Sequence, residues 1–419
     1  MNSKKSVAIV SFGTLLEWAE FTFFAYMADY LSALFFPADD ATFARLKIYG
    51  VFAASYIMRP IGAIIFGHMG DKYGRKKPMM ASLFLMALAT CGIGILPIYD
   101  SIGYASSIFL VIFRMLQGIA VGGEFNGATV LLTEYDKRRP FLAGSWTSFA
   151  ASAGMALGSL AATIVSFFGN NFFWRIPFLL SAVIAIAAVY FRRDIKETDD
   201  FCRAKANNEL FNIPIAAAWL HNKAGLVCTA AFSIFVSVFV YTGNVYYRTM
   251  AVSVGGLPPE QAATAVTVGI VLDTILIPIF ACLADKFNGY KLCFAGLFLA
   301  LVMSPLIMYM GSSGSFVWAI FGQLIYGVLD AIVSATAFTI LLRQFKTGAK
   351  YSGSSLAWSV STAIFGGTTL MINEFLVGHL NLWAGPGLYM SFSALICLVA
   401  VRYVLRRSHG LLLSIKGII

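Results

Sequence analysis

Long apolar runs are the feature that most constrains the fold. Segments of about 20 hydrophobic residues follow one another through most of the 419-residue chain. Only 12% of the residues are charged, against about 25% in an ordinary soluble domain. Runs of this length cross a bilayer as helices, and most of them lack the polar face of a water-exposed helix. The sequence therefore predicts an all-α integral membrane protein, in which twelve transmembrane helices can be drawn.

The basic residues are distributed in a way that predicts topology. The chain has 30 Lys and Arg against 20 Asp and Glu, a net charge of +10. Most of these basic residues lie in short loops that follow every second apolar run. Because cytoplasmic loops retain positive charge, we expect both termini to be cytoplasmic. A nucleic-acid partner would need one continuous basic face, which this pattern does not provide.

A polar stretch near the middle divides the apolar runs into two groups. We expect an N-terminal six-helix bundle at 1–192, a cytoplasmic linker at 193–222 and a C-terminal six-helix bundle at 223–419. The halves echo each other, since Asp71 and Asp285 end corresponding apolar runs. Paired repeats of this kind are typical of transporters, which rock two bundles about a central site.

A glycine-rich cationic loop, which contains Gly67, Asp71, Gly74 and Arg75, separates the second and third runs. The two glycines permit close helix contact and a tight turn. We expect Asp71 to cap the N-terminus of a helix in the first half and to pair with Arg75. These four residues are candidates for a cytoplasmic gate. The alternative is that the basic residues only fix the topology.

Ionisable side chains inside apolar runs need a reason, because each costs about a few kcal/mol or more at membrane depth. The first run carries Glu17 and Glu20, and the fourth carries Arg114, Gln117 and Glu124 on one helical face. We hypothesise proton coupling by Glu20 and Arg114, with Glu17 nearby, so that protonation of Glu20 releases Arg114. Arg114, Gln117 and Glu124 are also candidate substrate ligands. A permanent ion pair that only fixes helix packing is the alternative.

The second half supplies four further candidate substrate ligands, namely Asn244, Tyr247, Asp273 and Asp330. For the tyrosine, anchoring at the membrane interface is the competing interpretation. The two aspartates suit the cationic group of a zwitterionic substrate or serve as extra proton sites.

The sequence contains no pattern that predicts enzymatic chemistry. Its six cysteines and four histidines lack metal-ligand spacing, and no nucleophile–base constellation is visible. We therefore expect no catalytic residue, no metal and no cofactor, with protons as the coupling ion. A functional monomer in the lipid bilayer, with a small-molecule substrate, is the expected form.

These motifs resemble those of the major facilitator superfamily. Residues 67–77 match its loop signature, Gly-x-x-x-Asp-Arg/Lys-x-Gly-Arg-Lys/Arg, at every defining position. Residues 59–71, 114–124 and 197–201 are more specifically similar to its metabolite:H⁺ symporter branch. That resemblance implies proton symport of substrates such as citrate, α-ketoglutarate, shikimate, proline or betaine across a bacterial inner membrane. It also implies that Glu20 and Arg114 form the coupling pair.

The chain departs from the branch at two places. Ala19 stands where the branch has a tyrosine, and Arg343-Gln-Phe-Lys346 replaces an acid followed by Phe-Pro. The leading hypothesis is a proton-coupled importer of a small organic acid or zwitterion. The alternatives are a proton-driven efflux antiporter on the same scaffold and an importer of a polycarboxylate siderophore.

Overall fold

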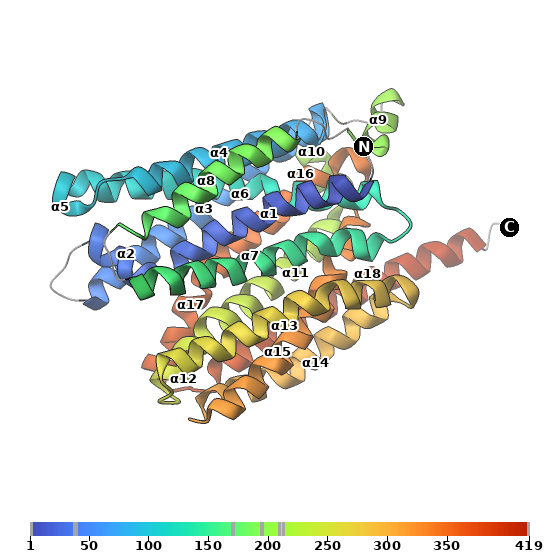
Figure 1. Ribbon diagram of the computed structural model, residues 1–419. Helices are drawn as coiled ribbons and strands as arrows, with labels where there is room; N and C mark the ends of the chain where they lie inside the picture. Colours follow the sequence, from blue (N-terminus) through green and yellow to red (C-terminus); the bar gives the residue numbers. More distant parts are fainter. Residues whose placement is uncertain are drawn as a thin grey trace.

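A computed structural model describes residues 3–36, 41–168, 172–192, 197–207, 211 and 214–416, and nearly all of these residues are helical. The described residues contain no β-strand. Long helices run alongside one another, with the first half (blue to green) beside the second (yellow to red) (Figure 1). The prediction of an all-α fold is confirmed.

The helices of the first half are α1 (Ser3–Tyr26), α2 (Ala28–Phe35), α3 (Ala41–Tyr73), α4 (Lys76–Ile95), α5 (Tyr99–Ile102), α6 (Tyr104–Tyr135), α7 (Pro140–Phe168) and α8 (Arg175–Arg192). Two short helices follow, α9 (Asp199–Ala206) and α10 (Pro214–His221). The second half contains α11 (Lys223–Val240), η1 (Tyr241–Tyr246), α12 (Tyr247–Ser253), α13 (Pro259–Lys286), α14 (Gly289–Ser312), α15 (Phe316–Leu342), η2 (Thr347–Ala349), α16 (Lys350–Ser361), η3 (Thr362–Gly366), α17 (Gly367–Glu374), η4 (Phe375–His379) and α18 (Gly385–Lys416).

The outer surface of the helices is apolar. Ten helical segments in the described part of the chain are long and apolar enough to cross a membrane. Large hydrophobic side chains such as Ile57, Leu88, Phe298 and Val399 are exposed on these segments. A water-soluble protein rarely exposes apolar surface on this scale, so the exposed side chains indicate contact with lipid.

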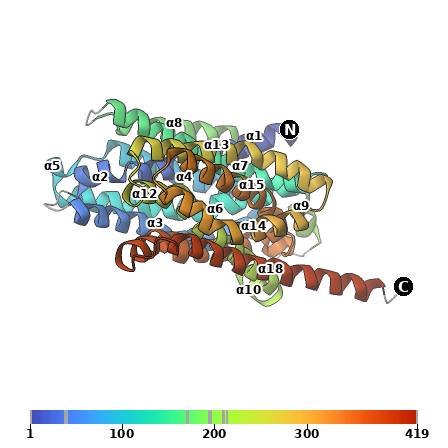
Figure 2. The same cartoon turned by 90° about the horizontal axis from the view of Figure 1, so that it is seen from below.

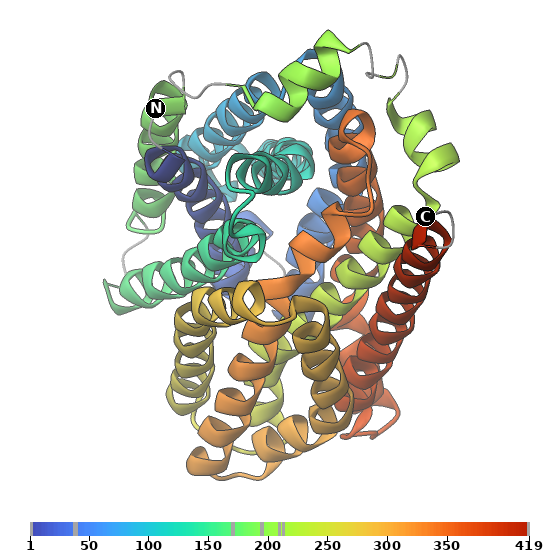
Figure 3. The ribbon, with the colours of Figure 1, turned by 90° about the vertical axis from the view of Figure 1, so that its right-hand side faces the viewer.

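Helices pack mainly within their own half of the chain. In the first half α1 lies against α7 and α3 against α6, and in the second α13 lies against α15 and α14 against α18. The two halves meet where α7 contacts α13 and α3 contacts α16. Figures 2 and 3 show the same two groups of helices from below and from the side.

Glycines bring α3 and α6 into direct backbone contact, which positions the charged residues of both helices. A Cβ atom at Gly62 of α3 would lie 1.8 Å from the carbonyl oxygen of Ile119. One at Gly118 or Gly122 of α6 would lie 2.0 or 2.1 Å from a carbonyl oxygen of α3. The close approach that small residues allow between membrane helices therefore occurs here as the sequence predicts.

Three π-helical segments interrupt the helices of the second half. η1 joins α11 to α12, η3 joins α16 to α17, and η4 follows α17. π-helical turns are rare and often occur at functional sites. Tyr241 of η1 lies against Tyr56 of α3, so one of these segments meets the first half.

Candidate functional site

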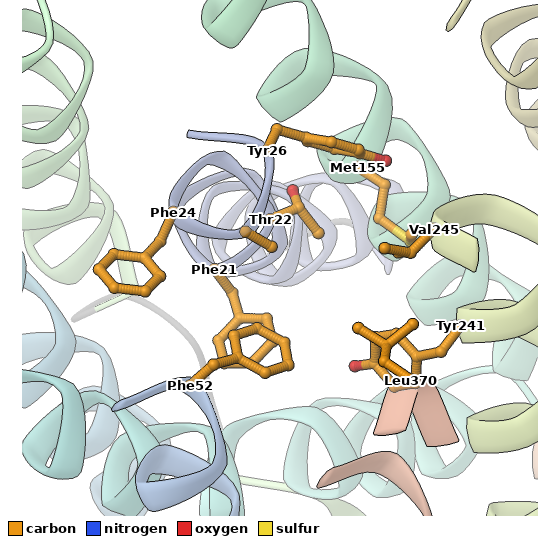
Figure 4. A pocket seen from close by; sticks show the side chains of 10 residues that line it. Phe21, Thr22, Phe24, Tyr26, Phe52, Met155, Tyr241, Val245 and Leu370 are labelled. Carbon is orange, nitrogen blue, oxygen red and sulfur yellow. The ribbon is translucent and has the colours of Figure 1, made fainter. Parts of the chain in front are cut away.

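A small cavity lies between the two halves. Its volume is about 50 Å³, which accommodates a water molecule but not a metabolite. In Figure 4, Phe21 and Phe52 lie on one side, Tyr241 and Leu370 on another, and Tyr26 lies beside Met155. The cavity is lined by Phe21, Thr22, Phe24, Ala25, Tyr26, Phe52, Met155, Tyr241, Val245 and Leu370. Both halves of the chain therefore contribute side chains to the lining of this cavity.

Two buried arginines lie behind the aromatic side of this cavity. The guanidinium carbon of Arg59 is 3.9 Å from the ring centroid of Tyr56 and 4.7 Å from that of Phe21. That of Arg114 is 4.0 Å from the centroid of Phe24 and 4.9 Å from that of Phe21. The rings hold the guanidinium groups by cation–π contact. The Nε and Nη2 atoms of both arginines have no hydrogen-bond partner in the described structure.

Glu20 is joined to Arg114 through two other side chains and not by a direct ion pair. Its carboxylate accepts hydrogen bonds of 2.5 Å each from the hydroxyls of Thr90 and Ser181. Thr90 in turn accepts a 2.8 Å bond from the Gln117 amide, whose oxygen accepts a 2.8 Å bond from Arg114. The described residues contain no direct ion pair of Glu20 with Arg114, because Thr90 of α4 and Gln117 lie between the two charged groups.

The remaining predicted residues of the first half are placed differently. Glu17 is buried and lies within electrostatic range of Arg59. Glu124 belongs to α6, but its side chain lies outside the part of the chain that the structure describes. Of the three polar residues predicted on one face of α6, the structure therefore describes the side chains of Arg114 and Gln117.

Two aspartates of the second half lie on neighbouring buried helices. Asp273 of α13 and Asp330 of α15 are each 3% exposed and lie within electrostatic range of each other. Asp273 accepts a 2.6 Å hydrogen bond from Ser152 of α7, which belongs to the other half. One oxygen of each aspartate has no hydrogen-bond partner. The structure thus brings together two residues that are 57 positions apart in the sequence.

Asn244 belongs to η1, and Tyr247 is the first residue of α12. The two side chains have different surroundings. Asn244 is buried, and its amide oxygen has no hydrogen-bond partner. The Tyr247 hydroxyl donates a 2.9 Å bond to the carbonyl oxygen of Ala319 and lies beside Gly322, while its ring packs against Gly311. Tyr247 is therefore packed inside the second half and does not line the cavity.

The predicted gate loop contacts the second half of the chain. Asp71 accepts hydrogen bonds of 3.3 and 2.8 Å from the backbone N–H groups of Tyr351 and Ser352, at the start of α16. It also pairs with Arg75 at 2.7 Å. The expected pairing is present, but the capped helix belongs to the second half and not to the first. A Cβ atom at Gly67 would lie 2.9 Å from the Cα atom of Ser352, so this glycine lets the helices touch. We call this contact the Asp71 latch.

A second latch repeats this geometry with the two halves exchanged. Asp285, at the end of α13, accepts hydrogen bonds of 2.9 Å each from the backbone N–H groups of Phe141 and Leu142, at the start of α7. We call this contact the Asp285 latch. A carboxylate at a helix N-terminus is favourable because the N–H groups and the helix dipole both point toward it. Each half therefore caps a helix of the other.

Arg75 connects the Asp71 latch to more distant residues. Its guanidinium donates a 2.8 Å bond to the carbonyl oxygen of Thr347 and lies 3.6 Å from Glu134 of α6. Glu134 also accepts bonds from Lys350 at 3.3 Å and from the Thr198 hydroxyl at 2.7 Å. The buried ion pair thus extends into a network that spans both halves.

The segment before α9 caps α4 at the same place. The Glu197 carboxylate accepts bonds of 2.9 and 3.3 Å from the backbone N–H groups of Arg75 and Lys76. Gly74 has a φ of +107°, and a Cβ atom there would lie 2.2 Å from Glu197. Only glycine suits this turn, both for its backbone angle and for lack of space. The sequence predicts the tight turn at Gly74, but it does not identify Glu134 or Glu197 as partners of Arg75.

A helical membrane protein with a cavity between two groups of helices has the architecture of a transporter. The model of the Major Facilitator Superfamily matches residues 21–369, and the chain belongs to this superfamily. The predicted resemblance is thereby confirmed, and the chain is a transporter and not an enzyme.

Several bacterial transporters are similar to the chain over most of its length. A putative proline/betaine transporter of Staphylococcus aureus (strain COL) is 31% identical over 99% of this chain and 90% of its own. The ectoine/proline transporter ProP of Corynebacterium glutamicum is 29% identical over 96% of this chain and 84% of its own. A citrate-proton symporter of Klebsiella pneumoniae is 30% identical over 95% of this chain and 91% of its own.

Solved structures share the fold at low sequence identity. The proton:xylose symporter XylE bound to 6-bromo-6-deoxy-D-glucose superimposes with a TM-score of 0.77 at 15% identity, covering 96% of this chain and 95% of XylE. The human organic anion transporter MFSD10 gives a TM-score of 0.73 at 15% identity, covering 96% of this chain and all of that one (100%). At such identities the likeness shows the fold alone.

Proposed function

We propose that the chain is a proton-coupled symporter that imports a small organic acid or zwitterionic metabolite by alternating access. The observation that carries this proposal is the buried hydrogen-bonded path from Glu20 through Thr90 and Gln117 to Arg114. The name of the Klebsiella relative, a citrate-proton symporter, supports proton coupling. Bacterial relatives support a location in the cytoplasmic membrane.

Protonation of Glu20 would change the hydrogen bonds along this path. As a carboxylate, Glu20 accepts bonds from both Thr90 and Ser181. Once protonated, it has a donor of its own, so one of these hydroxyls must turn. A turn of the Thr90 hydroxyl redirects its lone pairs, which would weaken its bond to Gln117 and, through Gln117, the hold on Arg114. Arg114 is then free to bind a substrate carboxylate, which couples proton binding to substrate binding.

The proposed topology comprises twelve spans, with both termini in the cytoplasm. We further propose bundles at 1–192 and 223–419 joined by a linker at 193–222, which the packing of helices within each half supports. The end that carries the Asp71 and Asp285 latches is then cytoplasmic. In this proposal Gly67, Asp71, Gly74 and Arg75 form a gate that is closed here and breaks when the cavity opens inward.

Substrate would bind in an opened form of the central cavity. We propose Arg114 and Gln117 from the first half, with Asn244, Asp273 and Asp330 from the second, as its polar ligands. Glu124 stays a candidate on sequence grounds alone. Protons are the proposed coupling ion, without any other cofactor, and the proposed functional unit is a monomer.

The experiment that tests the proposal uses purified protein in proteoliposomes. An inward-directed proton gradient should drive accumulation of a labelled substrate, chosen from a thermal-shift screen of carboxylates, amino acids and betaines. Expulsion of a preloaded substrate by the same gradient would instead establish the antiporter alternative. The antiporter alternative is favoured if a substrate cation and a proton compete for the pair formed by Asp273 and Asp330. Transport that is indifferent to the gradient would refute proton coupling.

A further inference from the structure

A second pocket lies between the two halves, at the end of the molecule that carries the latches. Its volume is about 230 Å³, below the roughly 300–1,000 Å³ of a metabolite site but far above what one water molecule needs. The ends of α6 and α15, the starts of α7 and α16, and α9 enclose it. Five of its lining residues are charged, namely Glu134, Lys137, Asp200, Arg343 and Lys350. We call it the charged pocket.

The charged pocket has more cations than acids, and both of its acids already have cationic partners. Asp200 forms a salt bridge with Lys137. Glu134 lies 3.3 Å from the ammonium group of Lys350 and 3.6 Å from the guanidinium group of Arg75. Neither acid is therefore left to neutralise a third cation in the pocket.

Arg343, the third cation, stands where the first half has an acid. Gly118 of α6 approaches a backbone carbonyl group of α3, and Gly327 of α15 makes the same kind of contact with α13. These matching contacts set an offset of 209 residues between α6 and α15, and the same offset relates Glu134 to Arg343. In the first half Glu134 contacts Arg75. The second half carries the opposite charge at this position.

The second half also lacks a charged partner for that position. The two latches set an offset of 214 residues between the ends of α3 and α13, which places Gly289 at the position of Arg75. The ring of Phe141 fills the space beside Gly289, since a Cβ atom there would lie 2.2 Å from it. The guanidinium carbon of Arg343 lies 5.2 Å from the centroid of the same ring. Arg343 has no salt bridge within the described residues, so this side of the gate contains a cation without an acid.

The charged pocket is accessible to water and not to lipid. Lys137 and Arg343 are exposed. Among the lining residues that the structure describes, none belongs to the large hydrophobic side chains exposed on the membrane-facing surface. A soluble ion can therefore enter the pocket. Lysine and arginine bind phosphate groups through charge-assisted hydrogen bonds, so the pocket has the chemistry of an anion site.

We propose that the charged pocket is a regulatory site for a small phosphate-like anion, and that the bound anion holds the gate closed. The anion would contact Lys137 of the first half together with Arg343 and Lys350 of the second, and would supply the negative charge that the second half lacks. Opening of the gate separates these cations, so the anion binds the closed state more tightly and stabilises it. This inference rests on the proposed gate, but it requires neither proton coupling nor an identified substrate.

Calorimetry tests the binding step. Inorganic phosphate and pyrophosphate are titrated into the purified full-length protein in nanodiscs of phosphatidylcholine, at constant ionic strength because salt screens such contacts. We expect saturable binding of at least one of these anions at a single site. Arg343→Gln should weaken that binding about tenfold, as for a charged hydrogen bond, and Arg343→Lys should weaken it less. The control Arg402→Gln, which neutralises an exposed arginine of α18 outside the pocket, should leave it unchanged.

Cysteine labelling tests the effect of the anion on the gate. Ser355 of α16 is buried, so a Ser355→Cys variant without the native cysteines is labelled by maleimide when the gate opens. An anion at about ten times its dissociation constant should slow this labelling about tenfold, because only the closed state binds it. Arg343→Gln should reduce the slowing to about twofold at the same concentration. Nanodiscs that contain phosphatidylglycerol, without added anion, should give the same labelling rate as those of phosphatidylcholine.

Four results overturn the proposal. These are the absence of saturable binding of both anions, binding that Arg343→Gln leaves unchanged, labelling that the bound anion does not slow, and slower labelling in phosphatidylglycerol alone, which would assign the site to a lipid headgroup. Neither assay uses a proton gradient or a substrate. A protein that shows both effects but no gradient-driven uptake would therefore refute the proposed coupling and leave this site standing.

Discussion

The Asp285 latch provides the most direct test of how the two halves are held together. Asp285→Asn keeps the shape of the side chain but removes the charge that faces the N-terminus of α7. The carboxylate accepts two backbone bonds of 2.9 Å each, and Asp285 is partly exposed. Loss of its charge should cost the closed state about 1–2 kcal/mol, between the values for a helix-dipole contact and a charged hydrogen bond.

A free-energy change of that size has a measurable effect on conformation. It multiplies the population of the open state about 5- to 30-fold. Ser355 of α16 is fully buried, and its hydroxyl has no hydrogen-bond partner in the described structure. A Ser355→Cys variant, made after replacement of the six native cysteines, therefore reports on opening through its rate of maleimide labelling.

The expected result is faster labelling of Cys at position 355 in the Asp285→Asn background, by about 5- to 30-fold. Glu260→Gln, which removes an acid in the first turn of the same helix, is the matched control and should leave the rate unchanged. Equal labelling rates in Asp285→Asn and in the parent protein, with both folded by gel filtration, would refute the role of this carboxylate in closure.

Three further predictions concern the proton path and the gate. Glu20→Gln should abolish accumulation driven by a proton gradient but retain exchange of labelled for unlabelled substrate in proteoliposomes; loss of both, in folded protein, would contradict a specific coupling role. Glu197→Gln weakens the cap on α4 by about 1 kcal/mol, so labelling at position 355 should rise about fivefold, and an unchanged rate would exclude the linker from the gate. Gly127→Ala places a Cβ atom 2.2 Å from the Tyr351 hydroxyl and should open the gate; in a Tyr351→Ala background the same substitution should have no further effect on labelling.

Features that depend on local composition were predictable from the sequence. The apolar helices follow from runs that are long enough to cross a bilayer. The close contact of α3 with α6 follows from Gly118 and Gly122, because a small residue on a membrane helix has few other uses. The ion pair of Asp71 with Arg75 follows from their spacing of four residues. In each case the determining residues lie near one another in the sequence.

The partners of the buried charges were not predictable, because they come from distant helices and are common residue types. Thr90 and Ser181 hydrogen-bond Glu20 from α4 and α8, and neither lies in a motif. The sequence does not tell which helix packs against which face of α1. Charge alone predicts that Glu20 and Arg114 act together, but it does not predict the two side chains that lie between them.

Tyr247 directly follows a π-helical segment, in which regular α-helical periodicity does not hold. A regular α-helix turns by about 100° per residue, and that rotation predicts which neighbours share a face. η1 is a π-helix, whose wider turn changes this rotation. Tyr241 and Val245 consequently line the cavity, while Tyr247 turns into the second half and bonds to Ala319. A π-helical segment cannot be recognised from the sequence, so the direction of the Tyr247 side chain cannot be predicted from it.

The two latches make the same contact between a carboxylate and the N-terminus of a helix, but they differ in their charged neighbours. Asp71 is fully buried and is held by Arg75, which also contacts Glu134 and the Thr347 carbonyl group. Asp285 is partly exposed and forms no salt bridge in the part of the chain described here. Removing one member of a buried ion pair leaves the other uncompensated, at about 3–5 kcal/mol, whereas a helix cap alone contributes less. The closed state therefore depends more on the first-half loop, and the Asp285 side is the weaker point at which the gate can begin to separate.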